Sequence, residues 1–166
     1  MFTETEMDYY QGVVNEYLRA NRATFINTEF CIQLSEGNGG LTKGSHWYCD
    51  AVVLSFEERI IYLCEISFAT NVPDLKSRLQ AWSNHWEGIK TAVKRDGHFN
   101  GALDNWAVKP WIFIPREGSG KFDVWAKSSL NFKVKITTLE ETQPWNYRSW
   151  DRKIVVNPPE EGKTAL

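Results

Sequence analysis

The sequence predicts a single α/β domain in which helices flank one central mixed β-sheet. Apolar residues recur every three or four positions over 7–18 and 72–93, a spacing typical of amphipathic helices. Runs rich in β-branched and aromatic residues cover 24–34, 46–55 and 59–67, as is typical of strands. A chain of 166 residues, 42% of them apolar, is long enough for one sizeable core and too short for two domains.

The N-terminal part of the chain predicts a helix, a strand and a loop. The helix runs from Met7 to about Leu18 and ends near Asn21. The strand covers 24–34 and is followed by 35–45, SEGNGGLTKGS. This segment contains too many glycines for a helix or a strand, so we expect a long loop there.

The middle of the chain predicts one long helix over 72–93. Pro73 is tolerated in a first helical turn, and Asn71 is suited to cap it. The apolar residues alternate steps of three and four without interruption: Val72, Leu75, Leu79, Trp82, Trp86, Ile89 and Val93.

The C-terminal part completes the predicted fold. WIFI at 111–114 reads as a buried strand, 121–130 as a short helix and 132–141 as a half-exposed strand. The predicted order is α-β-β-β-α-β, followed by the short helix and the further strand. We assign 1–156 to this domain and expect 157–166, NPPEEGKTAL, to be a disordered tail because it offers nothing to bury.

Composition and charge narrow the class of protein. The net charge of -2 lacks the overall basic excess that marks many nucleic-acid binders. Cys31, Cys49 and Cys64 lie in strand-like segments without CxxC spacing, so we expect reduced, buried thiols and no disulfide framework or zinc knuckle. The sequence shows no signal-peptide pattern and no apolar run of about 20 residues, which predicts a cytoplasmic protein outside the membrane. Protein partners and oligomeric state stay open, a homodimer included.

The two central strands place two carboxylates opposite each other. Alternation puts Asp50 on the same face as Val52, and Glu65 on the same face as Leu63. A four-residue turn over 56–59 then pairs Val52 with Leu63 and Asp50 with Glu65. The hairpin therefore predicts a pair of acidic side chains at the end far from its turn.

Two opposed carboxylates need compensation, because directly paired side chains have Cβ atoms about 4.5 to 5.5 Å apart and like charges repel at that distance. A shared proton is one solution, and a divalent cation with oxygen ligands is another. Such a cation polarises a phosphoryl oxygen and activates water, which is the chemistry of phosphodiester hydrolysis. The alternative is that the strands end at solvent, or slip in register, and leave both acids on an open rim.

At this point the chain resembles the PD-(D/E)XK nuclease superfamily, the fold of many restriction endonucleases and of recombination or repair nucleases. The resemblance rests on Asp50, an interval of fourteen residues and EIS at 65–67, within the order helix, three strands, helix, strand over roughly 5–115. It implies that Asp50 and Glu65 bind Mg²⁺ or Mn²⁺ and that the protein hydrolyses phosphodiester bonds in DNA.

The resemblance also implies a third acid from the first helix. Glu6 lies nearer the apolar face of that helix and is the preferred metal ligand, with Glu16 as the alternative. The alternative reading, that either residue is a charge that only meets water, is the one that the sequence favours.

Two departures from the family pattern concern catalysis. The proline that commonly precedes the Asp is absent, since Cys49 stands before Asp50. Ser67 replaces the motif lysine, which in the family positions the attacking water and stabilises charge on the phosphate. The following helix offers Lys76 as a replacement, with Arg78 on the other side of its apolar stripe; the alternative for Lys76 is a solvated helix face. Gln80 is a weaker polar candidate.

The sequence leaves three functions open. The first is a divalent-metal-dependent nuclease, in which Asp50 and Glu65 hold the metal and Lys76 assists. The second is a catalytically inactive nuclease-fold module for binding or assembly, which the missing lysine favours. The third is a small α/β interaction protein without a metal site, whose acids lie on a wet rim.

Overall fold

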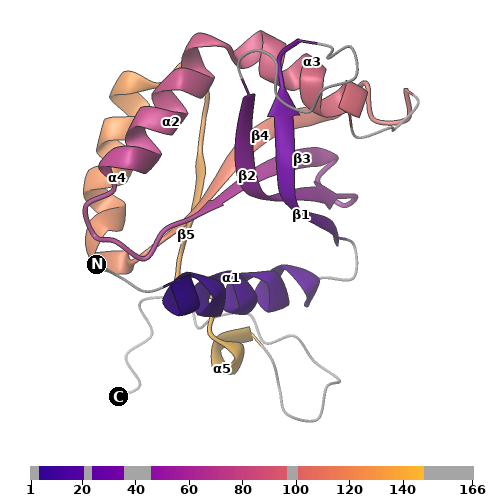
Figure 1. The fold of residues 1–166 in the computed structure, drawn as a ribbon. Coiled ribbons are helices and arrows are strands. Elements are labelled where there is room, and N and C mark those ends of the chain that lie inside the picture. Colours follow the sequence, from indigo (N-terminus) through magenta and orange to yellow (C-terminus); the bar gives the residue numbers. More distant parts are fainter. Residues whose placement is uncertain (1–3, 21–23, 36–45, 97–100, 148–166) are drawn as a thin grey trace, which may run out of the picture.

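The computed structural model describes residues 4–20, 24–35, 46–96 and 101–147, with side chains in the first helix from Tyr9 onward. The predicted class is confirmed: one domain with a mixed five-stranded sheet between helices, in the strand order β1-β2-β3-β4-β5 (Figure 1). Most of the predicted loop after β1 and the predicted tail at 157–166 lie outside the described residues. The elements are α1 (Glu4–Arg19), β1 (Thr24–Gln33), β2 (His46–Ser55), β3 (Ile60–Ile66), α2 (Pro73–Asn84), α3 (Trp86–Asp96), β4 (Ala107–Ile114), α4 (Arg116–Ser129), β5 (Lys135–Thr138) and α5 (Pro144–Tyr147).

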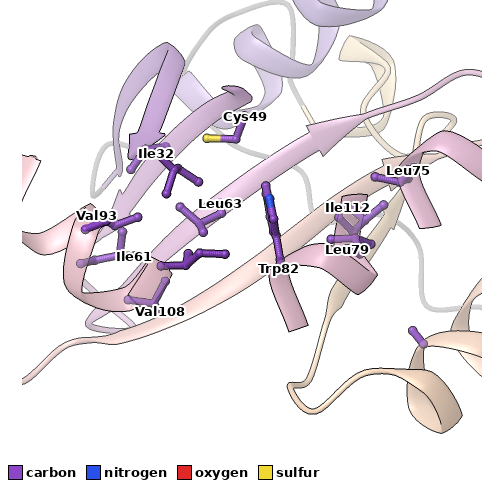
Figure 2. Close-up of a cluster of buried hydrophobic side chains, with 14 of the residues drawn as sticks. Ile32, Cys49, Ile61, Leu63, Leu75, Leu79, Trp82, Val93, Val108 and Ile112 are labelled. Atoms are coloured by element: carbon purple, nitrogen blue, oxygen red, sulfur yellow. The ribbon is translucent and has the colours of Figure 1, made fainter. Parts of the chain in front are cut away.

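Two layers of helices cover the sheet. Helices α1 and α5 lie on one side, and α2, α3 and α4 lie on the other (Figure 1). On the α1 side, Val14 and Leu18 pack against buried residues of β2, β3 and β4. On the opposite side, Leu79 and Trp82 of α2 meet Leu63 of β3 in a second cluster (Figure 2). The central strand β3 is therefore covered on both faces, and five of its residues are 4% exposed or less.

The hairpin has the predicted register. Strands β1, β2 and β3 are antiparallel neighbours, and β4 and β5 continue the sheet in parallel. Ser55 pairs with Ile60 around a four-residue turn, and Val52 pairs with Leu63. The ladder between β2 and β3 ends with Ala51 and Cys64, directly before the two acidic residues.

The predicted long helix is wrong in one respect, because it consists of two helices. The chain leaves helical geometry at His85. The backbone N–H of this residue donates to the Trp82 carbonyl oxygen, with an N···O distance of 3.0 Å, and forms a tight turn. The break directs α3 across β1, where Arg95 donates to the Gln33 carbonyl at 2.7 Å. The apolar spacing runs through the break because both helices pack on the same face of the sheet, so periodicity alone did not indicate it.

Helix α4 begins five residues earlier than predicted. The backbone N–H of Arg116 donates to the Glu140 carboxylate at 3.0 Å, which satisfies a free donor of the first turn from a distant part of the chain. This long-range cap supports a helix across the glycines at 118 and 120. Strand β5 is shorter than predicted because Glu141 accepts hydrogen bonds from the N–H and hydroxyl of Thr138 and ends it.

Glycine 118 allows α4 to approach the loop between β3 and α2. A Cβ at this position would lie 2.5 Å from the carbonyl oxygen of Thr70, closer than any side chain tolerates. The contact holds this loop, which connects Glu65 to α2, against the start of α4. None of the described helices is long and apolar enough to cross a membrane.

We expect Gly118→Ala to lower the free energy of unfolding by roughly 1 to 3 kcal/mol, because the added methyl group forces α4 away from Thr70. Gly120→Ala is the matched control in the same helix, since its Cβ meets nothing within 4 Å and alanine is the better helix former by about 1 kcal/mol. Urea denaturation of both variants tests this difference. Equal stability of the two variants would contradict the close approach.

Candidate functional site

Asp50 lies where strand β2 changes face. Cys49 and Val52, three residues apart, share the cluster beneath α2, although regular alternation would place them on opposite faces. Figure 2 shows Cys49 beside this cluster. On the neighbouring strand, Glu29 has a positive φ of 55° and the ladder omits the pair it would form with Asp50. The predicted common face of Asp50 and Val52 therefore does not continue regularly, because a local distortion of both strands intervenes.

Two donors hold the Asp50 carboxylate. Its Oδ1 accepts a hydrogen bond from Nε2 of Gln11 on α1 at 3.2 Å, and its Oδ2 accepts one from the backbone N–H of Ile66 at 2.6 Å. The second bond joins β2 to the end of β3 after the regular ladder has stopped. Tyr10, next to Gln11, stacks on Phe68 with ring centroids 5.5 Å apart, which fixes α1 against the loop that follows β3.

Glu65 is a buried carboxylate with one paired oxygen. Its side chain is 3% exposed, and Oε2 forms an ion pair with Nη1 of Arg78 on α2. Oε1 is buried and has no hydrogen-bond partner among the residues that the structure describes. Burial of an acidic oxygen without a hydrogen-bond partner lowers the stability of the folded protein. Such an oxygen therefore indicates a position where a ligand can bind.

The cation at the site is Arg78 and not Lys76. Both residues come from α2, as predicted, but the Lys76 ammonium lies over the Trp125 ring of α4, 5.5 Å from its centroid. Arg78 is three residues after Leu75 and four before Trp82, so it lies on the side of α2 that packs on the sheet.

The structure places the remaining predicted residues apart from the carboxylates or leaves them undescribed. The Ser67 hydroxyl accepts a hydrogen bond from the Ala69 N–H at 3.4 Å, and its backbone N–H donates to the Phe113 carbonyl. Glu6 lies outside the residues whose side chains are described. Glu16 is exposed and pairs with Arg19 on its own helix, so it meets water as the alternative reading expected.

Burial dominates the electrostatics of the acidic pair. Burial raises the pKa of Asp50, against the lowering effects of the Ile66 N–H and of Arg78. Burial and the negative charge of Asp50 together raise the pKa of Glu65 to about 8, although Arg78 acts in the opposite direction. The site is thus short of positive charge even with the guanidinium in place.

The residues present fit a small divalent cation. Mg²⁺ prefers oxygen ligands and is usually held by one or two carboxylates, with water and substrate phosphate completing the shell. Glu65 offers a buried, unpartnered oxygen, and the Asp50 oxygens each accept a single hydrogen bond and retain a lone pair. Within the described ranges no group of three or more His, Cys, Asp or Glu side chains gathers as a metal site. Asp50 and Glu65 are the two described residues that would hold such an ion, and the predicted third ligand, Glu6, lies outside the described side chains.

Comparison of the chain with models of protein families, with curated proteins and with solved structures finds no match.

Reasoning from the sequence missed Gln11 and preferred Lys76 to Arg78. Gln11 carries no charge, and its hydrogen bond to Asp50 appears only when α1 packs on the sheet. Arg78 was noted beside Lys76, but helical spacing did not distinguish which cation reaches Glu65. Lys76 stands between Val72 and Leu79 at the same steps of three and four that place Arg78 between Leu75 and Trp82.

We expect the free energy of unfolding to fall as the pH rises from about 4.5 to about 8, because the folded protein keeps the Glu65 proton in this range and the unfolded chain loses it. The decline approaches about 1.4 kcal/mol per pH unit. Glu65→Gln removes this contribution and is expected to flatten the curve measured by urea denaturation. Glu117→Gln, a change at an exposed residue of α4, serves as control and keeps the decline. Identical curves for Glu65→Gln and the wild type would contradict the raised pKa.

Proposed function

We propose that the protein is a divergent member of the PD-(D/E)XK nuclease superfamily that hydrolyses phosphodiester bonds in DNA with Mg²⁺ or Mn²⁺. One observation carries the proposal: Asp50 accepts a hydrogen bond from the N–H of Ile66, the residue after Glu65, and among the described residues a buried oxygen of Glu65 has no hydrogen-bond partner. The order of the elements supports it, because the structure has the predicted helix, three strands, helix and strand, with the long helix divided into α2 and α3 and with β4 parallel to β3.

Each residue of the site has a distinct task under this proposal. A bound Mg²⁺ or Mn²⁺ polarises a phosphoryl oxygen and lowers the pKa of bound water. Asp50 and Glu65 hold the ion, and Gln11 and the Ile66 N–H orient the Asp50 carboxylate. Arg78 supplies the positive charge that the resemblance assigns to a lysine, because Ser67 offers a hydroxyl without charge.

The proposal names metals that prefer oxygen ligands because the site offers carboxylate oxygens and no thiolate. Cys49 is near the acidic pair, but burial raises the pKa of its thiol well above the usual value, so it stays protonated and does not ligate. A cytoplasmic location belongs to the proposal as well. All three cysteines are free, and reduced thiols suit a reducing compartment.

A second candidate is a catalytically inactive nuclease-fold module that binds or assembles with other molecules. The ion pair between Arg78 and Glu65 favours it, because the guanidinium already compensates part of the charge that a metal would compensate. The third candidate is a small α/β interaction protein without a metal site, for which both acids would lie on a solvent-exposed rim. Glu65 does not fit that geometry, since its side chain is 3% exposed.

The nuclease proposal predicts cleavage of DNA that requires Mg²⁺ or Mn²⁺ and stops with EDTA. We expect Asp50→Asn to lower the rate at least about 100-fold, since it removes a ligand charge. The amide can still accept the Ile66 N–H, so the fold is expected to persist. A gel assay with supercoiled and linear DNA measures the rate, and circular dichroism checks the fold.

Asp104→Asn is the matched control for this experiment, because Asp104 is exposed in the segment before β4. It is expected to cleave at the wild-type rate. Cleavage by Asp50→Asn at the wild-type rate would remove Asp50 from the mechanism. A folded wild-type protein that cleaves no nucleic acid with either metal would favour the inactive module.

A further inference from the structure

The pair formed by Glu65 and Arg78 is unequal in its access to water. The Glu65 side chain is 3% exposed, whereas that of Arg78 is 38% exposed. A partly exposed guanidinium on a long, flexible side chain can leave the pair for solvent at small cost. The buried Glu65 carboxylate cannot move to solvent. If Arg78 leaves, the carboxylate needs another cation or a proton.

The guanidinium contacts Oε2 of Glu65 directly. Asp50 is joined to the same end of β3, because its Oδ2 accepts a hydrogen bond from the N–H of Ile66, the residue after Glu65. A metal ion held by the same two carboxylates would have to occupy the same small region. Two cations at that distance repel each other strongly where little water screens them.

We propose that Arg78 is a displaceable counter-cation: a divalent metal ion that binds Asp50 and Glu65 displaces the Arg78 guanidinium from Glu65 and releases it toward solvent. The inference rests on the proposed function and adds a coupling to it. Without metal, Arg78 compensates the buried Glu65. With metal bound, the released guanidinium is available to bind a substrate phosphate, which a planar guanidinium does well.

The remaining contacts of the site are compatible with this exchange. Asp50 keeps its hydrogen bonds to Gln11 and Ile66, neither of which involves Arg78. Glu65 is the one ion-pair partner of Arg78 among the residues that the structure describes, so its release breaks a single contact. Lys76 is held over Trp125 and does not take the vacated position.

Titration of the full chain with Mn²⁺ alone, followed by calorimetry, tests the competition. Arg78→Gln is expected to bind Mn²⁺ roughly tenfold more tightly than the wild type, because no guanidinium then competes for Glu65. Lys76→Gln removes a cation from the same helix and is expected to leave the affinity unchanged. Equal or weaker binding by Arg78→Gln would overturn the competition.

The position of Arg78 can be followed directly by NMR spectroscopy. The Nε–H signal of Arg78, assigned by its loss in Arg78→Lys, is expected to move to the range of solvent-exposed arginines when Mg²⁺ saturates the protein. An Arg78 signal that Mg²⁺ at saturation leaves unmoved would overturn the displacement.

The outcomes separate this inference from the proposed function. Metal binding and DNA cleavage with an unmoved Arg78 signal would overturn the displacement and leave the nuclease intact. Absence of Mn²⁺ binding in both the wild type and Arg78→Gln would overturn the metal site and both proposals. Binding by Arg78→Gln alone would support the competition and favour the inactive module over the nuclease.

Discussion

The burial of the Glu65 carboxylate is the constraint on which the site depends. Strand β3 is the central strand of the sheet and is covered by helices on both faces, so a charge near its end must find its partners within the protein. Arg78 of α2 reaches it from one side of the sheet. Asp50, which adds negative charge, is held by Gln11 of α1 and by the Ile66 N–H. Both helices are thereby connected to one pair of acids.

A distortion of the sheet provides the geometry for this pair. Regular pairing between β2 and β3 stops at Ala51 and Cys64, and the Asp50 carboxylate takes over the N–H of Ile66. Glu29, opposite Asp50 on β1, adopts a left-handed conformation that costs a non-glycine residue about 1 kcal/mol or more. Strain of this kind is often kept where a strand must direct a side chain to a site. The distortion frees Asp50 from strict alternation, so it can meet α1 while Glu65 meets α2.

Local patterns were sufficient for much of the fold. The polar turn at 56–59 determined the hairpin register, because side chains alternate and one slip would have exposed the apolar residues of β3. Periodicity could not reveal the break at His85, since the same apolar spacing serves two helices that pack on one sheet face. The start of α4 was also hidden, because its cap comes from Glu140, far along the chain. Of these two errors, only the start of α4 arose where a distant residue satisfied the backbone.

The sequence by itself determined the α/β class and the hairpin register from Ser55 to Val52, because turn chemistry and alternation act between residues close in the chain. The tertiary structure decided which cation faces the pair. Lys76 and Arg78 are both basic and two residues apart on one helix, yet the packing of α4 provides Trp125 for the lysine and leaves Glu65 to the arginine. Only the assembled layers bring Gln11 to Asp50, since hydrogen bonds between distant elements depend on how helices pack on the sheet and not on local spacing.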